Sequence, residues 1–445
     1  MSTFEALKAY WSAGRRWQHL SGAALEDFQH VKALETTRWV NIHSSFYRNL
    51  WAGRDLTDWR SLPTVDKRAM MDNFSTFNTA GISKEAALEV ALRAERERDF
   101  APQIGQFTVG LSSGTSGHRG AFLVSKLEST AWAGVILARA LHRPLLGALI
   151  RGERIAFFLR ANSNLYERVG SARVRFSYFD LMTPPLEAVA RLEALQPTVL
   201  VAPPSLLLAL LKLQPRIAPR QIIAVAETLE PQDKAKLEVG FGVMVGQIYQ
   251  ATEGLIAVSC RCGRLHLMED IVAVQLEPLA QASSLERERF TPIITDLWRR
   301  TQPIIRYRLN DTVQLETSQL EGTPCQCGNS WRRLAAIEGR MDDTLEFLDA
   351  TGAVRLVYPD TIRRAVLLAS PNILEYAAQQ TAPNELCVQL EVAPSFEHAA
   401  IASVQQSLET ELMRYEIRVT RLTVTIGIPA QMLGSKRRRV KRLIP

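Results

Sequence analysis

The sequence predicts a mixed α/β protein. A large N-terminal region of parallel α/β sheets plus a smaller β region precedes a small α+β domain. Three observations lead to this prediction. Between about residues 120 and 250, short continuous apolar segments alternate with helical ones, as in a buried, largely parallel sheet. Beyond residue 250 the segments are shorter and alternate in polarity, which indicates antiparallel strands. With 445 residues, 47% of them hydrophobic, the chain can form two or three domains with large cores.

Helices are expected to dominate the first hundred residues. Residues 1–60 are amphipathic, and we expect a helical cap whose aromatic side chains, Trp11 among them, pack inward. A turn and a helix start follow at Leu62–Arg68, and a charged helix is expected over Lys84–Asp99. The alternating region is expected to contain strands at Ala121–Ser125, Arg154–Leu159, Arg175–Phe179, Thr198–Ala202 and Ile222–Val225, and helices at Leu127–Arg139, Pro185–Leu195 and Ser205–Lys212.

The domain boundary is predicted near Gly339–Asp343, which divides the chain into domains of residues 1–339 and 340–445. Within the first, about 255–335 should be the β-rich part. The second is expected to follow the order β-β-α-β-α-β, with strands that include Glu385–Glu391 and Arg421–Thr425.

Composition excludes several classes of protein. No apolar run approaches the roughly 20 residues of a membrane helix, and the N-terminal residues lack a signal pattern. We therefore expect a cytoplasmic protein without membrane association. The net charge of +7 is compatible with an anionic ligand but does not require nucleic acid. Part of that charge lies in Lys436–Arg442, which by itself would suggest a nucleic-acid or targeting tail.

A loop rich in glycine and hydroxyl side chains lies between two β-prone segments, at Ser112–Gly120. Successive backbone N–H groups in such a loop can surround anionic oxygens, and Ser and Thr hydroxyls add donors. The loop matches neither the Walker A pattern nor G-x-G-x-x-G. A flexible connection is the alternative interpretation.

Other segments offer groups for nucleotide chemistry. Tyr249 could stack on a base or line an acyl pocket, Thr252 could bond a phosphate, and Glu253 could hold Mg²⁺. The carboxylate of Asp311 could accept both ribose hydroxyls.

Two Cys-x-Cys-Gly pairs, Cys260/Cys262 and Cys325/Cys327, are far apart in the sequence. In a cytosolic chain they favour structural Zn²⁺ over disulfides, and His266 could replace one cysteine. Four reduced thiols without a metal are the alternative. Cys387 stands alone in a predicted strand and is expected in the core.

The Ser112–Gly120 loop closely resembles the phosphate loop of the adenylate-forming superfamily of acyl- and aryl-CoA ligases. Four further segments resemble motifs of that superfamily in the same order, over nearly the whole chain: Gly246–Gly254, Pro303–Asp311, Gly339–Asp343 and Gly434–Val440. Gln250 and Asn310 stand where the superfamily has glycine, and Asn310 would tolerate a positive φ. The phenylacetate-CoA-ligase-like branch is the most similar, with its subgroup named for the synthetase that adenylylates a deazaflavin cofactor.

The resemblance implies roles for particular residues. Catalysis would involve Thr252, Glu253 and Lys436, with Mg²⁺ on Glu253, and Asp342 would lie at the hinge of a mobile C-terminal domain. A lysine at position 436 is a compact cation able to stabilise the charge that develops on the α-phosphate, and Lys441 is the competing candidate. The implied ATP-binding residues are Ser112, Ser113, Gly114, Thr115, Ser116, Gly117, Arg119, Glu227, Thr228, Tyr249, Asp311 and Arg340. The implied acid pocket contains Tyr178, Ala226, Gln250 and Ala251.

The implied reaction has two steps. A carboxylic acid attacks Mg·ATP to give an acyl-adenylate and pyrophosphate, and a thiol of coenzyme A or an acyl carrier protein then displaces AMP. An adenylyltransferase without a thiol step and a non-catalytic nucleotide-binding scaffold are the alternatives. Relatives of this type tend to be homodimers, so a homodimer is expected.

Overall fold

The computed structural model describes residues 2–99, 101–111, 120–142, 147, 150–159, 174–279, 288–316, 324–429 and 436–444. The chain forms two compact units, which are described separately below. The first comprises Met1–Leu276, Pro292–Leu309 and Leu315–Ala335, and the second comprises Glu277–Thr291, Asn310–Gln314 and Ala336–Pro445. The division at residue 340 expected from the sequence stays a prediction. Within the described ranges, no helix is both long and apolar enough to cross a membrane.

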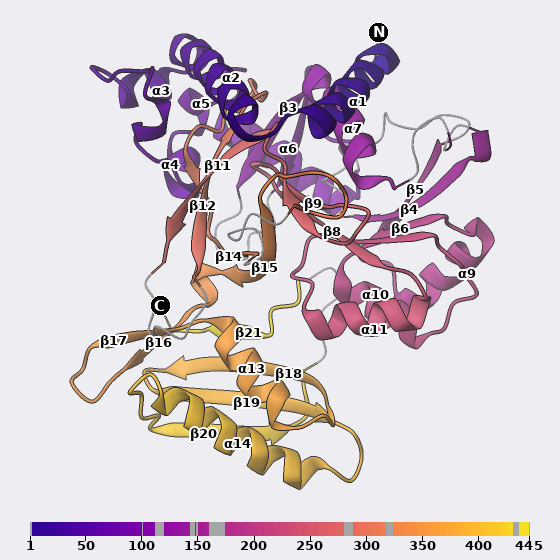
Figure 1. Cartoon of the computed structure of the whole chain (residues 1–445), viewed down its shortest axis with the longest axis vertical. Coiled ribbons are helices and arrows are strands. Elements are labelled where there is room, and N and C mark those ends of the chain that lie inside the picture. The colour runs from indigo at the N-terminus through magenta and orange to yellow at the C-terminus, as the bar shows by residue number, and fades with distance from the viewer. Residues whose placement is uncertain are drawn as a thin grey trace. The chain divides into compact units, whose positions relative to one another are not determined.

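The first unit begins with helices, as expected (Figure 1). They are α1 (Ser2–His19), α2 (Gly22–His43), α3 (Ser45–Leu50), the 3-10 helix η1 (Trp59–Ser61), α4 (Lys67–Asp72), α5 (Phe74–Phe77) and α6 (Lys84–Glu97). Side chains at the N-caps begin three of them: Ser44 accepts from the Tyr47 N–H at 3.4 Å, Asp66 from the Ala69 N–H at 2.8 Å and Ser83 from the Ala86 N–H at 3.2 Å.

The aromatic side chains of this cap divide into two groups. Tyr47 and Trp51 are buried, as predicted, and the ring of Tyr47 contacts both Trp51 and the buried Phe77 of α5. The prediction was wrong for Trp11, whose side chain is 61% exposed on α1. The helical period places Trp11 on the same side of α1 as Phe4, which is also exposed. Apolar periodicity therefore identified the helix without showing which face it buries.

Strands of the first unit form one small sheet and most of one large sheet. The small sheet pairs β1 (Gln103–Ile104), β2 (Phe107–Leu111) and β3 (Ala121–Ser125) in that order. The large sheet has the order β11-β12-β14-β15-β10-β9-β8-β7-β6-β4-β5, with β13 paired to β12. Its strands are β4 (Glu153–Leu159), β5 (Val174–Asp180), β6 (Val199–Ala202), β7 (Gln221–Ala224), β8 (Val245–Ala251), β9 (Gly254–Ser259), β10 (Leu265–Leu267), β11 (Val272–Pro278), β12 (Phe290–Asp296), β13 (Tyr307–Arg308), β14 (Asp311–Leu315) and β15 (Arg333–Arg340).

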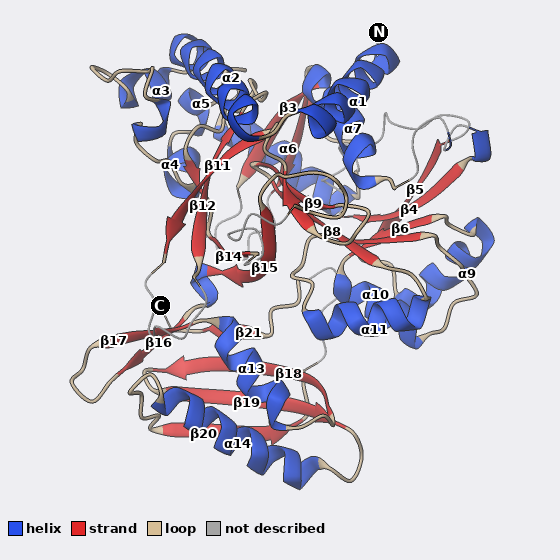
Figure 2. Cartoon of the chain, in the orientation of Figure 1, coloured by secondary structure: helices blue, strands red, loops and turns tan. Residues whose placement is uncertain are grey.

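The parallel part of this sheet confirms the α/β prediction. Strands β5, β4, β6, β7 and β8 are parallel neighbours, and β9 then pairs antiparallel with β8. Every residue of β6 and β7 is buried, which explains why both strands are continuously apolar or nearly so. The connecting helices are α7 (Lys126–Ala140), α9 (Pro185–Leu195), α10 (Pro204–Lys212) and α11 (Pro231–Phe241). Figure 2 shows α9, α10 and α11 on one side of these strands and α7 on the other.

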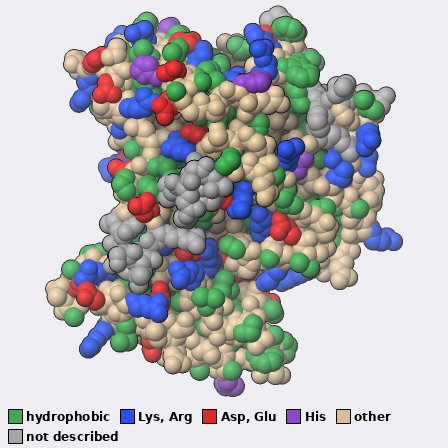
Figure 3. All heavy atoms as spheres, in the orientation of Figure 1, with side chains coloured by type: hydrophobic (Ala, Val, Ile, Leu, Met, Phe, Trp, Pro, Cys, Tyr) green, Lys and Arg blue, Asp and Glu red, His purple; other side chains and the backbone are tan. Residues whose placement is uncertain are grey.

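Basic and acidic groups are mixed on the surface of this unit. Over the part that carries α2 to α5, Figure 3 shows Lys and Arg side chains interspersed with Asp and Glu. The net charge of +7 is therefore not gathered into one basic patch on that part of the face shown.

The second unit is a small α+β structure, as predicted. A hairpin of β16 (Leu345–Leu348) and β17 (Val354–Val357) precedes a four-stranded sheet of order β20-β19-β18-β21. The sheet strands are β18 (Ile373–Ala382), β19 (Glu385–Val392), β20 (Arg421–Ile426) and β21 (Val440–Arg442), and the helices are α13 (Pro359–Ala369) and α14 (Glu397–Met413). The described residues thus contain two more strands than the predicted order, because β18 and β19 form a hairpin and β21 adds to the sheet.

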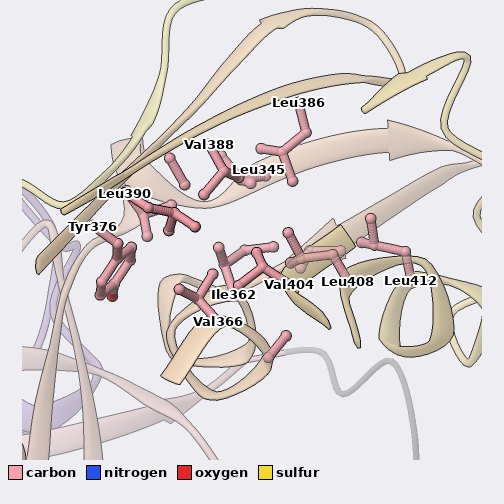
Figure 4. Close-up of a cluster of buried hydrophobic side chains, with 14 of the residues drawn as sticks. Leu345, Ile362, Val366, Tyr376, Leu386, Val388, Leu390, Val404, Leu408 and Leu412 are labelled. Carbon is pink, nitrogen blue, oxygen red and sulfur yellow. The ribbon is translucent and has the colours of Figure 1, made fainter. Parts of the chain in front are cut away.

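Apolar side chains from both helices and the sheet form the core of the second unit (Figure 4). Val366 of α13 and Leu408 of α14 lie toward Val388 and Leu390 of β19 in this view, and all four side chains are fully buried. Apolar and polar residues alternate over residues 385–391, which predicted a strand. In β19, every second side chain of this stretch faces the core and the others lie on the opposite face of the sheet.

A close approach of α1 to α7 gives a test of the packing. A Cβ atom at Gly134 of α7 would meet the carbonyl oxygen of Ala6, so Gly134→Ala should lower the free energy of unfolding by about 1–3 kcal/mol. At Gly14 of α1 a Cβ atom would meet nothing within 4 Å, so Gly14→Ala should raise it by about 0.5–1 kcal/mol. Urea unfolding followed by far-UV circular dichroism measures both changes. Equal effects of the two substitutions would contradict the described contact.

Candidate functional site

The predicted phosphate-binding residues Ser112, Ser113, Gly114, Thr115, Ser116, Gly117 and Arg119 lie outside the described residues. Both flanking strands are described, and the loop connects them as expected. Leu111 at the end of β2 pairs with Ala121 at the start of β3. The two ends of the loop are therefore adjacent, as they are in a hairpin.

Thr252 and Glu253 form the turn that connects β8 to β9, where Ala251 pairs with Gly254. A Cβ atom at residue 254 would lie 3.2 Å from Val272 Cγ1 and 3.8 Å from the Asp296 carboxylate, so this position favours glycine. The close packing behind Gly254 fixes the turn against β11 and β12.

Both oxygens of the Glu253 carboxylate accept hydrogen bonds from hydroxyl groups. The Thr252 hydroxyl donates to Oε2 at 2.8 Å, and the Tyr307 hydroxyl donates to Oε1 at 3.0 Å. Glu253 is 9% exposed and Tyr307 is 2% exposed. Burial, followed by the charge of Glu253, raises the pKa of Tyr307 far above its ordinary value. The arrangement presents a buried, oriented carboxylate at the end of a strand, which is a suitable ligand for a hard divalent cation.

Arg299 joins this turn to β3. Its guanidinium donates to the Thr252 carbonyl at 2.6 Å and to the Leu123 carbonyl at 3.1 Å. It also donates to the side chain of Gln302 at 3.1 Å, and Gln302 in turn accepts from the Leu123 N–H at 2.8 Å. Sequence reasoning missed Arg299 and Gln302. Their positions just before the Pro303–Asp311 motif were the available signal.

A buried carboxylate holds the backbone of Arg299. Asp296 Oδ1 accepts from the N–H groups of Trp298 at 2.8 Å and Arg299 at 2.9 Å. Burial raises the pKa of Asp296 to about 6, although these N–H groups and the Arg299 charge oppose the rise. Asp296 therefore fixes the loop from which the Arg299 side chain extends.

Six of the predicted nucleotide- and acid-binding residues lie at the carboxyl ends of two parallel strands. Ala226, Glu227 and Thr228 follow β7, and Tyr249, Gln250 and Ala251 end β8, with an irregular register after Tyr249. Ligands of open α/β sheets bind at this edge. The Glu227 carboxylate accepts from the Ser205 N–H at 3.0 Å and the Ser205 hydroxyl at 2.9 Å, at the start of α10.

Tyr178 is the predicted pocket residue that the sheet sets apart. It lies on β5, and β4, β6 and β7 separate it from Gln250 and Ala251 on β8. Four strand spacings amount to about 19 Å. The roles of all these residues stay predictions.

The cysteine pairs meet in space. Cys260, Cys325, Cys327 and His266 form a group in which one ligand atom from each lies within 4.8 Å of the others. Cys260 Sγ lies 3.8 Å from Cys325 Sγ, and Cys327 Sγ lies 3.6 Å from His266 Nε2. The predicted ligand Cys262 is outside this group, and His266, the alternative expected from the sequence, lies in it.

Both Cys-x-Cys-Gly segments fold into the same kind of turn. The Gly263 N–H donates to the Cys260 carbonyl at 2.8 Å, and the Gly328 N–H donates to the Cys325 carbonyl at 2.9 Å. Both glycines have positive φ, +75° and +90°, which explains why glycine follows each pair.

Two distances in this group, Cys260 Sγ to Cys325 Sγ and Cys327 Sγ to His266 Nε2, match those of a tetrahedral zinc site. Zn–S bonds of about 2.3 Å and Zn–N bonds of about 2.0–2.1 Å place ligand atoms about 3.8 Å (S to S) and about 3.5–3.6 Å (S to N) apart. Burial lowers the pKa of His266 to about 4, so the imidazole is neutral, the form that binds metals. Burial also raises the pKa of the Cys327 thiol to about 12, so metal binding would have to displace its proton. The donor set is one that zinc prefers.

In the second unit, hydrogen bonds link the Asp311 segment to the predicted hinge. Asn310 Nδ2 donates to Asp342 Oδ2 at 2.6 Å, and the Met341 N–H donates to the Asn310 carbonyl at 3.2 Å. Asp311 starts β14, and Arg340 ends β15 directly before the 3-10 helix η2 (Met341–Asp343). Asn310 is not among the described residues with positive φ, so glycine-like conformational freedom is not what this turn requires.

The basic run Lys436–Arg442 contains four paired arginines, one of which, Arg442, pairs with Glu346. Arg437 and Arg439 donate to Glu375 Oε2 at 3.0 Å and 2.7 Å, and Arg438 Nε donates to Asp343 Oδ2 at 3.1 Å. Arg439 is 8% exposed. These arginines stabilise the second unit, which argues against the interpretation of the run as a nucleic-acid tail. Lys441 lies in β21 opposite Gln379, whereas Lys436 precedes the strand.

Comparisons with known proteins show the fold. No family model matches the chain, and no curated protein matches it. A solved 2-hydroxyisobutyryl-CoA ligase, in a postadenylation state with R3-HIB-AMP, is similar at a TM-score of 0.68 and 19% identity; the match covers 96% of this chain and 91% of the ligase. A GH3.15 acyl acid amido synthetase matches at a TM-score of 0.58 and 12% identity, over 96% of this chain and 95% of the synthetase. An ATP-bound RpMatB-BxBclM chimera matches at 0.50 and 16%, over 73% of this chain and 65% of the chimera. At these identities the matches establish architecture, and over 96% of its length this chain has the fold of the 2-hydroxyisobutyryl-CoA ligase and of the GH3.15 acyl acid amido synthetase.

Proposed function

We propose that this chain is an adenylate-forming acid–thiol ligase. A carboxylic acid, aryl or acyl, would attack the α-phosphate of ATP to give an acyl-AMP and pyrophosphate, and a thiol of coenzyme A or an acyl carrier protein would then displace AMP. The observation that carries the proposal is the match to 2-hydroxyisobutyryl-CoA ligase over 96% of this chain. That ligase has been solved with 2-HIB-AMP in a postadenylation state, and with 2-HIB-AMP and CoA in a thioesterification state.

The described geometry supports particular roles in this reaction. Glu253, held by the Thr252 and Tyr307 hydroxyls, would bind Mg²⁺, which would neutralise phosphate charge when bound. The Ser112–Gly117 loop with Arg119 would hold the phosphates, Asp311 the ribose, and Glu227, Thr228, Tyr249 and Arg340 other parts of ATP. Lys436 would stabilise the charge that develops during adenylation. Asp342 would be the hinge residue about which the C-terminal domain turns between the two half-reactions.

The acid amido synthetase match favours a second candidate, in which an amine replaces the thiol as acceptor. Activation of the acid would be the same, so only the second step distinguishes the two functions. An adenylyltransferase without a thiol step would not respond to either acceptor. A cytoplasmic location, a homodimer and the absence of a nucleic-acid partner stay predictions.

Acid-dependent pyrophosphate release from ATP tests the proposal. A panel of aryl, acyl and amino acids should reveal at least one acid that stimulates release, and coenzyme A should accelerate turnover with that acid. Lys436→Ala should lower the rate of release by about 100–1000-fold, because a positioned charge at the transition state is lost.

Lys441→Ala is the matched control, since Lys441 is a nearby lysine of the same basic run. Its rate should stay within about twofold of the wild-type rate. A large loss with Lys441→Ala and none with Lys436→Ala would reassign the catalytic lysine. Acceleration by an amine and not by coenzyme A would select the amido synthetase, and no release with any acid would contradict both functions.

We also propose that Cys260, His266, Cys325 and Cys327 bind a structural zinc ion. The four ligands leave no open coordination position for catalysis. The site would connect segments 65 residues apart, as measured from Cys260 to Cys325. His266 contacts the ring of Trp17, and Asn329 donates to the Trp17 carbonyl at 2.8 Å, so the site also supports α1.

Metal analysis of the purified chain should find about one zinc per molecule. Cys325→Ser and His266→Ala should remove it, whereas Cys262→Ser and Cys387→Ser should retain it, because neither lies in the group of four. Chelation should change tryptophan fluorescence, since Trp17 lies beside both His266 and Trp331. Loss of zinc in Cys262→Ser but not in His266→Ala would show that the four cysteines are the ligands.

A further inference from the structure

Hydrogen bonds hold the backbone of the Thr252–Glu253 turn in place independently of the Glu253 carboxylate. Arg299 holds the Thr252 carbonyl at 2.6 Å, and the flanking residues Ala251 and Gly254 are paired in the β8–β9 hairpin. What remains to be set is the rotation of the Glu253 side chain. A long carboxylate side chain loses considerable conformational entropy on being held, so its orientation needs a partner.

Glu253 has two hydroxyl partners, Thr252 and Tyr307. The backbone of Tyr307 is paired on both sides. On one side it pairs with Ile294 of β12. On the other it is bridged to Val65, whose N–H donates to the Arg306 carbonyl at 3.0 Å and whose carbonyl accepts from the Arg308 N–H at 2.8 Å. Val65 belongs to the Leu62–Arg68 turn, to which sequence analysis gave no function.

The backbone directly before Tyr307 is unusual. Arg306 has φ of +48°, in the left-handed region that side chains other than glycine rarely adopt. Its N–H donates to the Thr295 hydroxyl at 3.0 Å, and its carbonyl accepts from Val65. The strained residue Arg306 directly precedes Tyr307, whose hydroxyl donates to Glu253.

We infer that Tyr307 is a positioning residue for the divalent cation of this site. Its buried hydroxyl occupies one side of Glu253 Oε1 and so directs the remaining lone pairs of the carboxylate toward a metal ion bound with the nucleotide. Tyr307 touches neither the nucleotide nor the acid in this role. The inference rests on the proposed function.

Tyr307→Phe tests it, because the substitution removes one hydroxyl and preserves the buried ring. Groups that orient metal ligands typically change metal affinity by about 10–100-fold when they are lost. Binding of Mn²⁺ to the full-length protein saturated with a non-hydrolysable ATP analogue, measured by calorimetry, should weaken by about tenfold. Binding of the analogue alone, in EDTA, should not change.

Tyr47→Phe is the matched control. Tyr47 is a fully buried tyrosine whose hydroxyl donates to the Pro303 carbonyl at 3.3 Å and accepts from the Ile305 N–H at 3.2 Å. Both of these backbone partners are close to Tyr307 in the sequence. It contacts the backbone instead of a carboxylate, so Tyr47→Phe should leave Mn²⁺ affinity within about twofold. A similar loss of affinity in both variants would overturn the inference, because general loosening of the segment would then explain the effect.

The wild-type protein separates the failure of this inference from that of the proposed function. If wild type binds Mn²⁺ with the analogue and Tyr307→Phe binds it equally well, the positioning role is wrong and the ligase proposal stands. If wild type binds no nucleotide-dependent Mn²⁺, both are wrong.

Discussion

The hydrogen bonds of the Arg299 guanidinium hold together the candidate site of the first unit, as far as its residues are described. It donates to carbonyl groups of Thr252 and Leu123, which are 47 and 176 residues away in the sequence. One planar guanidinium supplies several donors at fixed angles, so a single side chain can hold both carbonyls. The Thr252–Glu253 turn and β3 are therefore held at one separation. Asp296, Gln302 and Tyr307 each stabilise a different part of the same arrangement.

Patterns within short segments predicted the parallel layer well. Continuous burial of β6 and β7 produces the apolar runs that identified them, and α9 has the bounds predicted from its sequence, Pro185–Leu195. For the second unit, the order of elements predicted from the sequence has two strands fewer than the described residues contain. One of them, β21, is an edge strand of three residues with a basic sequence, so no apolar pattern marks it. Such a strand is recognised only by the neighbour with which it pairs.

Side chains that act through distant partners could not be predicted in the same way. The Cys-x-Cys spacing placed two pairs of thiols near each other, but the spacing alone did not show that His266 of β10 lies beside them while Cys262 does not. Likewise, the run from Lys436 to Arg442 gave the position of a basic segment without its partners. Its arginines pair with Glu375 and Asp343, which are more than 60 residues earlier in the sequence. Positions relative to remote carboxylates are tertiary information.

The attachment of α1 has a consequence for the order of folding during synthesis. This helix can pack on α7 early, but its polar partners come later: Arg16 pairs with Asp270, the Trp17 carbonyl with Asn329 and the Leu20 carbonyl with Trp331. At about 5–20 residues per second, the 312 residues from Trp17 to Asn329 take roughly 15–60 s to translate. Until then the ring of Trp17 lacks its contacts with His266 and Trp331, and the nascent chain exposes an aromatic helix. The end of α1 is therefore held in place only after Asn329 and Trp331 have been synthesised.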